Sequence, residues 1–170
     1  MASPELLIDA FERIRDAVHP AVNGLTREEL VFRPDAESNS IAWLAWHLSR
    51  IQDDHVAHLA GTGQRWLDGG WAERFGLPFD PSDTGYGHDP GQVDLVVVEA
   101  RPLLDYFEDV HSATLAYLST VTEDELDRVV DAGWDPPVTV RIRLISVIAD
   151  DLQHVGQAAY VRGIIHRRTP

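Results

Sequence analysis

Residues 38–61 read SNSIAWLAWHLSRIQDDHVAHLAG, and this stretch decides the fold that we expect. Ser40 is a favourable N-cap residue and Gly61 a favourable residue after a C-terminus, so one helix is predicted over residues 41–60. Its apolar residues recur at the three- and four-residue spacing of a buried helix face: Ile41, Leu44, Ala45, Leu48, Ile51 and Leu59. Such a helix needs other helices or a sheet to cover that face.

Three further long stretches show the same apolar spacing, and they provide the partners. They cover about residues 4–18, 102–120 and 139–164. The segment GWDPP, residues 133–137, contains proline and glycine and must interrupt any helix. The last long helix therefore begins after it. Shorter helical turns are predicted over residues 26–30, 64–68, 71–75 and after Thr122. Four long helices with one extended connection indicate an all-α four-helix bundle.

The extended connection follows the second long helix and covers residues 61–101. It holds most of the glycine and several aromatic side chains. Residues 93–98 are strand-like in composition but have no obvious partner strand. Connections of this length usually carry function or cover another part of the molecule. We therefore expect this one to be ordered.

Composition excludes several classes of protein. The 170 residues suit a single domain, residues 1–170, and the net charge of −14 argues against a nucleic-acid partner. No apolar run is long enough to span a bilayer, and the N-terminus lacks the basic region of a signal peptide, so we expect a cytoplasmic protein without membrane contact. The chain has no cysteine. Any metal site must therefore use imidazole and carboxylate ligands.

One candidate site of that kind lies on the last helix. Asp150 and His154 are four residues apart, which turns a helix by about 400° and places both side chains on one face. A carboxylate and an imidazole so placed can reach one divalent ion. Asp151 is three residues from His154 and is a rival ligand. His47 on the second helix is a candidate third ligand.

Other polar residues of the second helix are less suitable. Asp54 and His58 point in nearly the same direction as His47, but they lie about 10 Å and 16 Å further along the axis. Metal–ligand bonds are about 2 Å long, so neither can easily share an ion with His47. We interpret them, with His55, as surface groups or parts of a second site.

Each candidate also has a simpler interpretation. A single buried histidine is more often a hydrogen-bonded core residue, and Asp-x-x-x-His on a helix is more often an ion pair. Helical geometry alone does not connect His47 to the last helix. The tryptophans are core residues by default: Trp43, Trp46, Trp66, Trp71 and Trp134.

Two stretches together resemble a known family. SNSIAWLAWHL, residues 38–48, and DDLQHVGQ, residues 150–157, are similar to motifs of the DinB-like metalloprotein superfamily, in the branch of mycothiol-dependent transferases. The resemblance implies an up-down-down-up four-helix bundle that binds a divalent ion, zinc or nickel. It places the ligands at His47, Asp150 and His154. The family more often has histidine at the position of Asp150.

The resemblance also implies a chemistry. A low-molecular-weight thiol such as mycothiol would be transferred to an electrophile. From their positions near the candidate ligands, we expect Gln153 and Gln157 to contact the cofactor, and Asp54 and Asp151 are further candidates that could orient a ligand. A homodimer is expected from the resemblance. Two alternatives remain open: a non-catalytic metal-binding or stress-response module, and a hydrolase.

Overall fold

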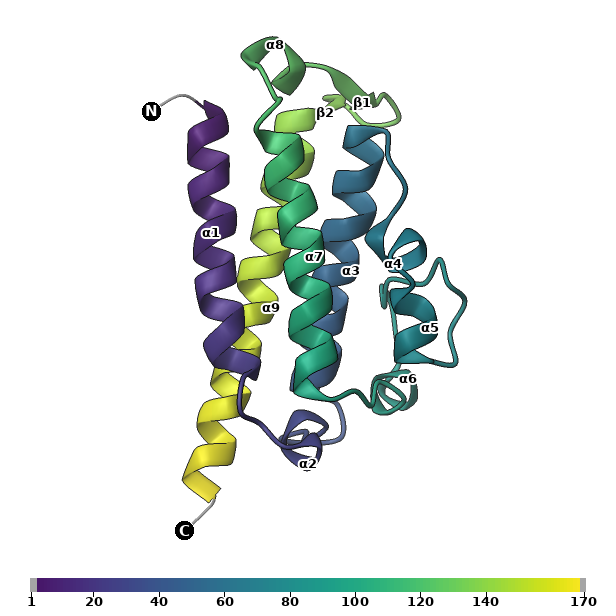
Figure 1. The fold of residues 1–170 in the computed structure, drawn as a ribbon, viewed down its shortest axis with the longest axis vertical. Helices are drawn as coiled ribbons and strands as arrows, with labels where there is room; N and C mark the ends of the chain where they lie inside the picture. The colour runs from purple at the N-terminus through teal and green to yellow at the C-terminus, as the bar shows by residue number, and fades with distance from the viewer. Residues whose placement is uncertain (1–2, 169–170) are drawn as a thin grey trace.

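Four long helices form the body of the protein in a computed structural model, which describes residues 3–168 (Figure 1). They are α1 (Ser3–Val22), α3 (Ile41–Ala60), α7 (Ala100–Leu118) and α9 (Val140–Arg168). α9 packs against α1 and α3, and α7 packs against the same two helices from the other side. In Figure 1, α1 and α9 run in one direction and α3 and α7 in the other. The predicted all-α class is confirmed.

The helix that carries His47 has the predicted bounds, and its caps explain why. The side chain of Ser40 accepts a hydrogen bond from the backbone N–H of Trp43, and Gly61 adopts the left-handed conformation, with φ of 67°. α1 extends four residues beyond its predicted end and passes through Pro20. Burial of Ala21 and Val22 against the core offsets the backbone hydrogen bond that this proline cannot make.

The long connection is ordered and follows the outer side of α3 and α7 (Figure 1). It contains three short helices: α4 (Arg65–Asp68), α5 (Trp71–Phe75) and α6 (Pro90–Asp94). The strand-like residues 93–98 form no strand. Their first two residues end α6, and Val93, Val96 and Val98 are buried in the core that the helices share.

The remaining elements close the two ends of the bundle. α2 (Arg27–Leu30) lies at one end, and α8 (Glu123–Leu126) lies at the other. Beside α8, β1 (Val129–Asp131) pairs antiparallel with β2 (Val138–Thr139), a hairpin that we did not predict. The segment GWDPP forms its turn. The expectation that Trp134 is a core residue is wrong, because the turn leaves this side chain 68% exposed.

One continuous hydrophobic core joins the four long helices. Every long helix contributes fully buried side chains to it, among them Phe11, Trp46, Phe107 and Leu144. The other predicted core tryptophans are buried as expected. Within residues 3–168, no helix combines the length and apolar character needed to cross a bilayer.

Candidate metal centre

His47, Asp150 and His154 come together where α3 packs against α9. Nε2 of His154 lies 3.5 Å from Oδ1 of Asp150, and Nε2 of His47 lies 4.0 Å from Oδ2 of the same carboxylate. One potential ligand atom from each residue lies within 4.8 Å of the other two. Ligand atoms about 2.1 Å from a tetrahedral ion are about 3.4 Å apart. Side-chain movements of about 1 Å would therefore let all three reach one cation.

Both imidazoles are held in the form that can bind a metal. Nδ1 of His47 is 2.6 Å from the carbonyl oxygen of Thr84, and Nδ1 of His154 is 3.0 Å from the side-chain oxygen of Gln157. Carbonyl oxygens only accept hydrogen bonds, so each Nδ1 carries a proton and donates it. In the neutral form of each ring, the lone pair is then on Nε2, the atom that faces Asp150.

The charges of the three groups depend on their burial. Burial lowers the pKa of His47 and favours the neutral ring. Burial works against the carboxylate of Asp150, but the hydrogen bond from His154 and the nearby imidazoles lower its pKa overall. Burial also disfavours the imidazolium of His154, yet its contacts with Asp150 and Gln157 raise its pKa. An anionic Asp150 thus faces two imidazoles, which suits a divalent cation.

One oxygen of Asp150 tests whether the three residues fit a cation. Its Oδ2 atom is buried and has no hydrogen-bond partner. Buried carboxylate oxygens normally have one, because an unpaired buried acceptor costs about 1–3 kcal/mol. A cation held by the three residues would satisfy this atom. The donor set therefore fits the ion that the sequence comparison implied.

The other predicted site residues lie elsewhere. The side chain of Asp151 is fully buried, burial raises its pKa well above the usual value, and both oxygens lack a hydrogen-bond partner. It points into the bundle because one residue turns a helix by about 100°. Asp151 is therefore no ligand, and the rival prediction is wrong. Asp54 accepts a hydrogen bond from the amide of Gln64, and the amide of Gln153 donates to the carbonyl of Ala149.

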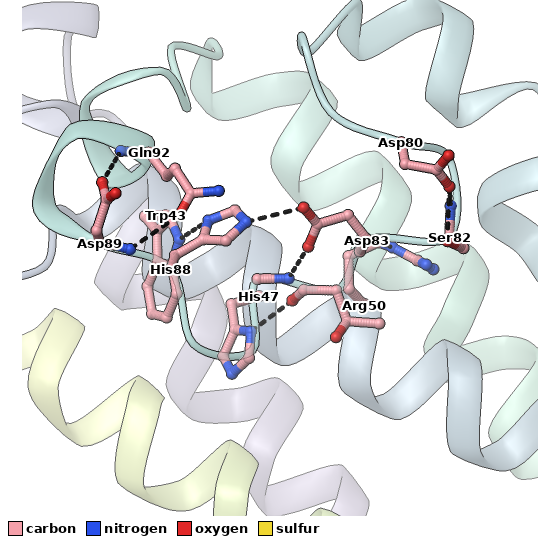
Figure 2. Close-up of polar contacts among 11 residues, drawn as sticks. Trp43, His47, Arg50, Asp80, Ser82, Asp83, His88, Asp89 and Gln92 are labelled. Carbon is pink, nitrogen blue, oxygen red and sulfur yellow. Dashed lines mark hydrogen bonds and ion pairs between the residues drawn. The ribbon is translucent and has the colours of Figure 1, made fainter.

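The long connection provides contacts to the site that we did not predict. The carbonyl of Thr84 contacts Nδ1 of His47, and the neighbouring Asp83 bonds to the backbone of Gly85 and to His88 (Figure 2). Trp43 stacks on the ring of His47, with centroids 4.6 Å apart and planes at 13°. In the sequence, only the length of the connection indicated that it carries function or covers another part of the molecule.

A cavity of about 450 Å³ lies next to the three residues in the same groove between α3 and α9. Leu44 and Gln157, one helical turn from His47 and His154 respectively, contribute to its wall. Ser38, Asn39 and Tyr160 add neutral polar groups. The volume is within the range of small-molecule sites.

These features define a helical-bundle protein with a partly open site of two imidazoles and one carboxylate. A model of the mycothiol-S-transferase family matches residues 6–167. The chain therefore belongs to the mycothiol-S-transferase family, within the DinB-like group. Among solved structures, a conserved protein from Enterococcus faecalis matches with a TM-score of 0.89 and 32% identity, over 95% of this chain and 96% of the other. A comparison with curated proteins gives no match.

Proposed function

We propose that the protein is a divalent-metal-dependent thiol S-transferase, which joins an external low-molecular-weight thiol such as mycothiol to an electrophile. The observation that carries this proposal is the unpartnered Oδ2 of Asp150 beside two imidazoles whose lone pairs face it. Two imidazoles and one carboxylate are also a ligand set of catalytic zinc sites, which keep a coordination position open for substrate. Zinc and nickel are the ions that we propose.

In this proposal the ion activates the thiol, and residues of the chain bind the rest of the thiol molecule. A bound divalent cation would lower the pKa of a coordinated thiol and so supply a thiolate near neutral pH. The chain has no cysteine, so the sulfur must come from an external molecule. The cavity beside Gln157 can hold the rest of that molecule, and its polar lining of hydroxyl and amide groups with the carboxylate of Asp35 suits a ligand with hydroxyl or amide groups.

The test compares electrophile consumption with and without an added thiol. Protein loaded with zinc or nickel should consume an electrophile from a broad panel only when the thiol is present. His154→Ala should abolish this activity, because it removes a ligand. His58→Ala is the matched control, since His58 is an exposed histidine near the far end of α3.

Two outcomes would contradict the proposed transferase activity, and each would support one of the two alternative functions. Full metal occupancy without turnover across the panel would indicate a non-catalytic metal-binding module. Equal turnover with and without thiol would indicate a hydrolase. Metal content must be measured for each variant, because Asp150 is a shorter ligand than the histidine that is more usual in the family.

A further inference from the structure

The part of the long connection that reaches the metal centre is residues 83–88, which we call the strap. We propose that the strap fixes His47 in its metal-binding tautomer, so that docking of the strap and binding of a divalent cation stabilise each other. This inference rests on the metal site of the proposed function. It assigns a role to residues of the connection that are not themselves ligands.

The contact between His47 and Thr84 sets the tautomer. The Thr84 carbonyl is 2.6 Å from Nδ1 and can only accept, which requires the proton on that nitrogen. In Figure 2 the other ring nitrogen points away from the strap, towards α9. Without this carbonyl the proton could occupy either nitrogen, and the tautomer with a proton on Nε2 cannot bind a metal through that atom.

Gly85 allows the strap to approach this closely. Its φ of +88° is in the left-handed region that favours glycine. A Cβ atom at this position would lie 2.9 Å from Nδ1 of His47 and 2.8 Å from the ring of Trp46. Any side chain at residue 85 must therefore push the strap away from α3, and the Thr84 carbonyl would move with it.

Asp83 closes the strap on itself. One carboxylate oxygen accepts the backbone N–H of Gly85 at 2.7 Å, and the other is 3.0 Å from Nε2 of His88. Nδ1 of His88 accepts a hydrogen bond from the indole N–H of Trp43 at 3.1 Å, so Nε2 carries the proton and donates to Asp83. The carbonyl of Asp83 accepts from Nε of Arg50.

The strap is thus attached to three residues on one face of α3, Trp43, His47 and Arg50 (Figure 2). These positions are four and three residues apart, so a single helix face presents them together. The middle contact, between Nδ1 of His47 and the Thr84 carbonyl, orients a proposed metal ligand. A cation bound to Nε2 of His47 and the carbonyl at Nδ1 therefore favour the same ring orientation and tautomer. By linkage, each must strengthen the other to the same extent.

Gly85→Ala and Asp83→Asn test the proposal. Zinc affinity, measured by competition with a chromophoric chelator, should fall about tenfold in each, the scale expected when a partner that orients a metal ligand is lost. Asp80→Asn is the matched control. Asp80 lies in the same connection and accepts hydrogen bonds only from Ser82 among the contacts drawn in Figure 2. The zinc affinity of Asp80→Asn should stay within twofold of that of the wild type.

Two further measurements separate orientation of His47 from general loss of structure. Nitrogen-15 NMR of the metal-free wild type should show a proton on Nδ1 of His47, whereas Gly85→Ala should show the other tautomer as well. Zinc should slow hydrogen exchange at the Gly85 amide in the wild type and not in His47→Gln. If Gly85→Ala fails to fold, His88→Phe is used in its place. The phenylalanine ring can keep the contact with Phe79 while the hydrogen bonds of His88 to Trp43 and Asp83 are lost.

Each outcome has a defined meaning. Wild-type zinc affinity in the strap variants, or an unchanged His47 tautomer in them, would overturn the strap proposal and leave the metal site intact. No zinc binding by the wild type would overturn both proposals. Zinc binding with no thiol-dependent turnover would overturn only the proposed transferase activity.

Discussion

Asp150 and His154 form an ion pair across one turn of α9, with Oδ1 and Nε2 3.5 Å apart, while the second oxygen of the same carboxylate has no hydrogen-bond partner. One half of the carboxylate is therefore satisfied within the protein and the other half is not. A buried carboxylate oxygen normally has a hydrogen-bond partner. This asymmetry distinguishes the pair from an ordinary i,i+4 ion pair on a helix surface.

Replacement of Asp150 tests whether its charge holds the cation. Asp150→Asn keeps the size of the side chain but removes the negative charge, and zinc affinity should fall at least tenfold. Asp150→His should retain zinc binding, because an imidazole nitrogen is also a zinc ligand. Competition with a chelator measures both. Asp54→Asn is the control, and an affinity in Asp150→Asn equal to that control would exclude Asp150 as a ligand.

Gln157 should contribute to metal affinity by orienting His154. Its side-chain oxygen accepts the proton of Nδ1 at 3.0 Å, which leaves Nε2 free to bind. Gln157→Ala should lower zinc affinity about tenfold, as other losses of a partner to a metal-bound histidine do. The matched control is Gln153→Ala, since that amide bonds the carbonyl of Ala149. Equal effects of the two variants on zinc affinity would contradict this role of Gln157.

Sequence patterns were sufficient to predict the four long helices and the grouping of His47, Asp150 and His154 for a simple physical reason. Helical spacing places Asp150 and His154 on one face whatever the rest of the fold does. The family motif then connects them to His47, which lies 103 residues before Asp150 and on another helix. Residue types that bind metals are few, so such positions carry information that is visible in the sequence.

The contacts of the strap could not be predicted in the same way. Thr84 acts through its backbone carbonyl, which every residue has, so its identity carries no signal. The inward direction of Asp151 was also undetermined, because a carboxylate beside Asp150 is as compatible with the helix edge as with the core until the neighbours of α9 are known. Trp134 was assigned to the core on residue type alone, whereas the hairpin exposes it.

His111 should make the folded state less stable at acidic pH. It is buried between α7 and α1, its ring nitrogens lack hydrogen-bond partners, and Glu12 is 3.7 Å away. Burial lowers its pKa from 6.5 in the folded protein. The unfolded chain therefore takes up the proton first as pH falls, and stability that is complete above pH 6.5 is lost as the pH falls towards the folded-state pKa.

His111→Leu should remove this pH dependence. Urea unfolding at pH 8 and pH 5 measures the free energy of unfolding of both proteins. We expect the variant to gain about 1 kcal/mol relative to the wild type between these two values. Other histidines with a lowered pKa are present in both proteins and cancel in the difference. If the two proteins differ in free energy of unfolding by the same amount at pH 8 and pH 5, the pKa of His111 is the same in the folded and unfolded states, and the prediction is wrong.

The exposed side of α9 suggests how the expected homodimer forms. The net charge of the chain is −14, yet none of the ten exposed positions of α9 between residues 141 and 160 is charged. They are Ile142, Ile145, Ser146, Ala149, Leu152, Gln153, Gly156, Gln157, Ala159 and Tyr160. Two copies that each carry this net charge repel least where they meet through such a face.

The spacing of this face is also complementary to itself. Its apolar and small residues recur at alternating intervals of three and four, the pattern of helices that pair along their length. An antiparallel pair centred between residues 150 and 151 places a large side chain opposite a small residue in every layer: Ile142 with Ala159, Ile145 with Gly156, and Leu152 with Ala149. Gly156 has open space where its Cβ would be. We therefore propose a second copy of the chain as the occupant.

Leu152→Arg should break this dimer, because it places two like charges near the twofold axis, where juxtaposition costs several kcal/mol. Sedimentation equilibrium should show a dissociation constant raised by about 100-fold or more. Leu67→Arg is the matched control, since Leu67 on α4 and Leu152 are each 48% exposed and the substitution is the same. A monomeric wild type, or equal dissociation constants in the two variants, would show that α9 is not the dimer interface.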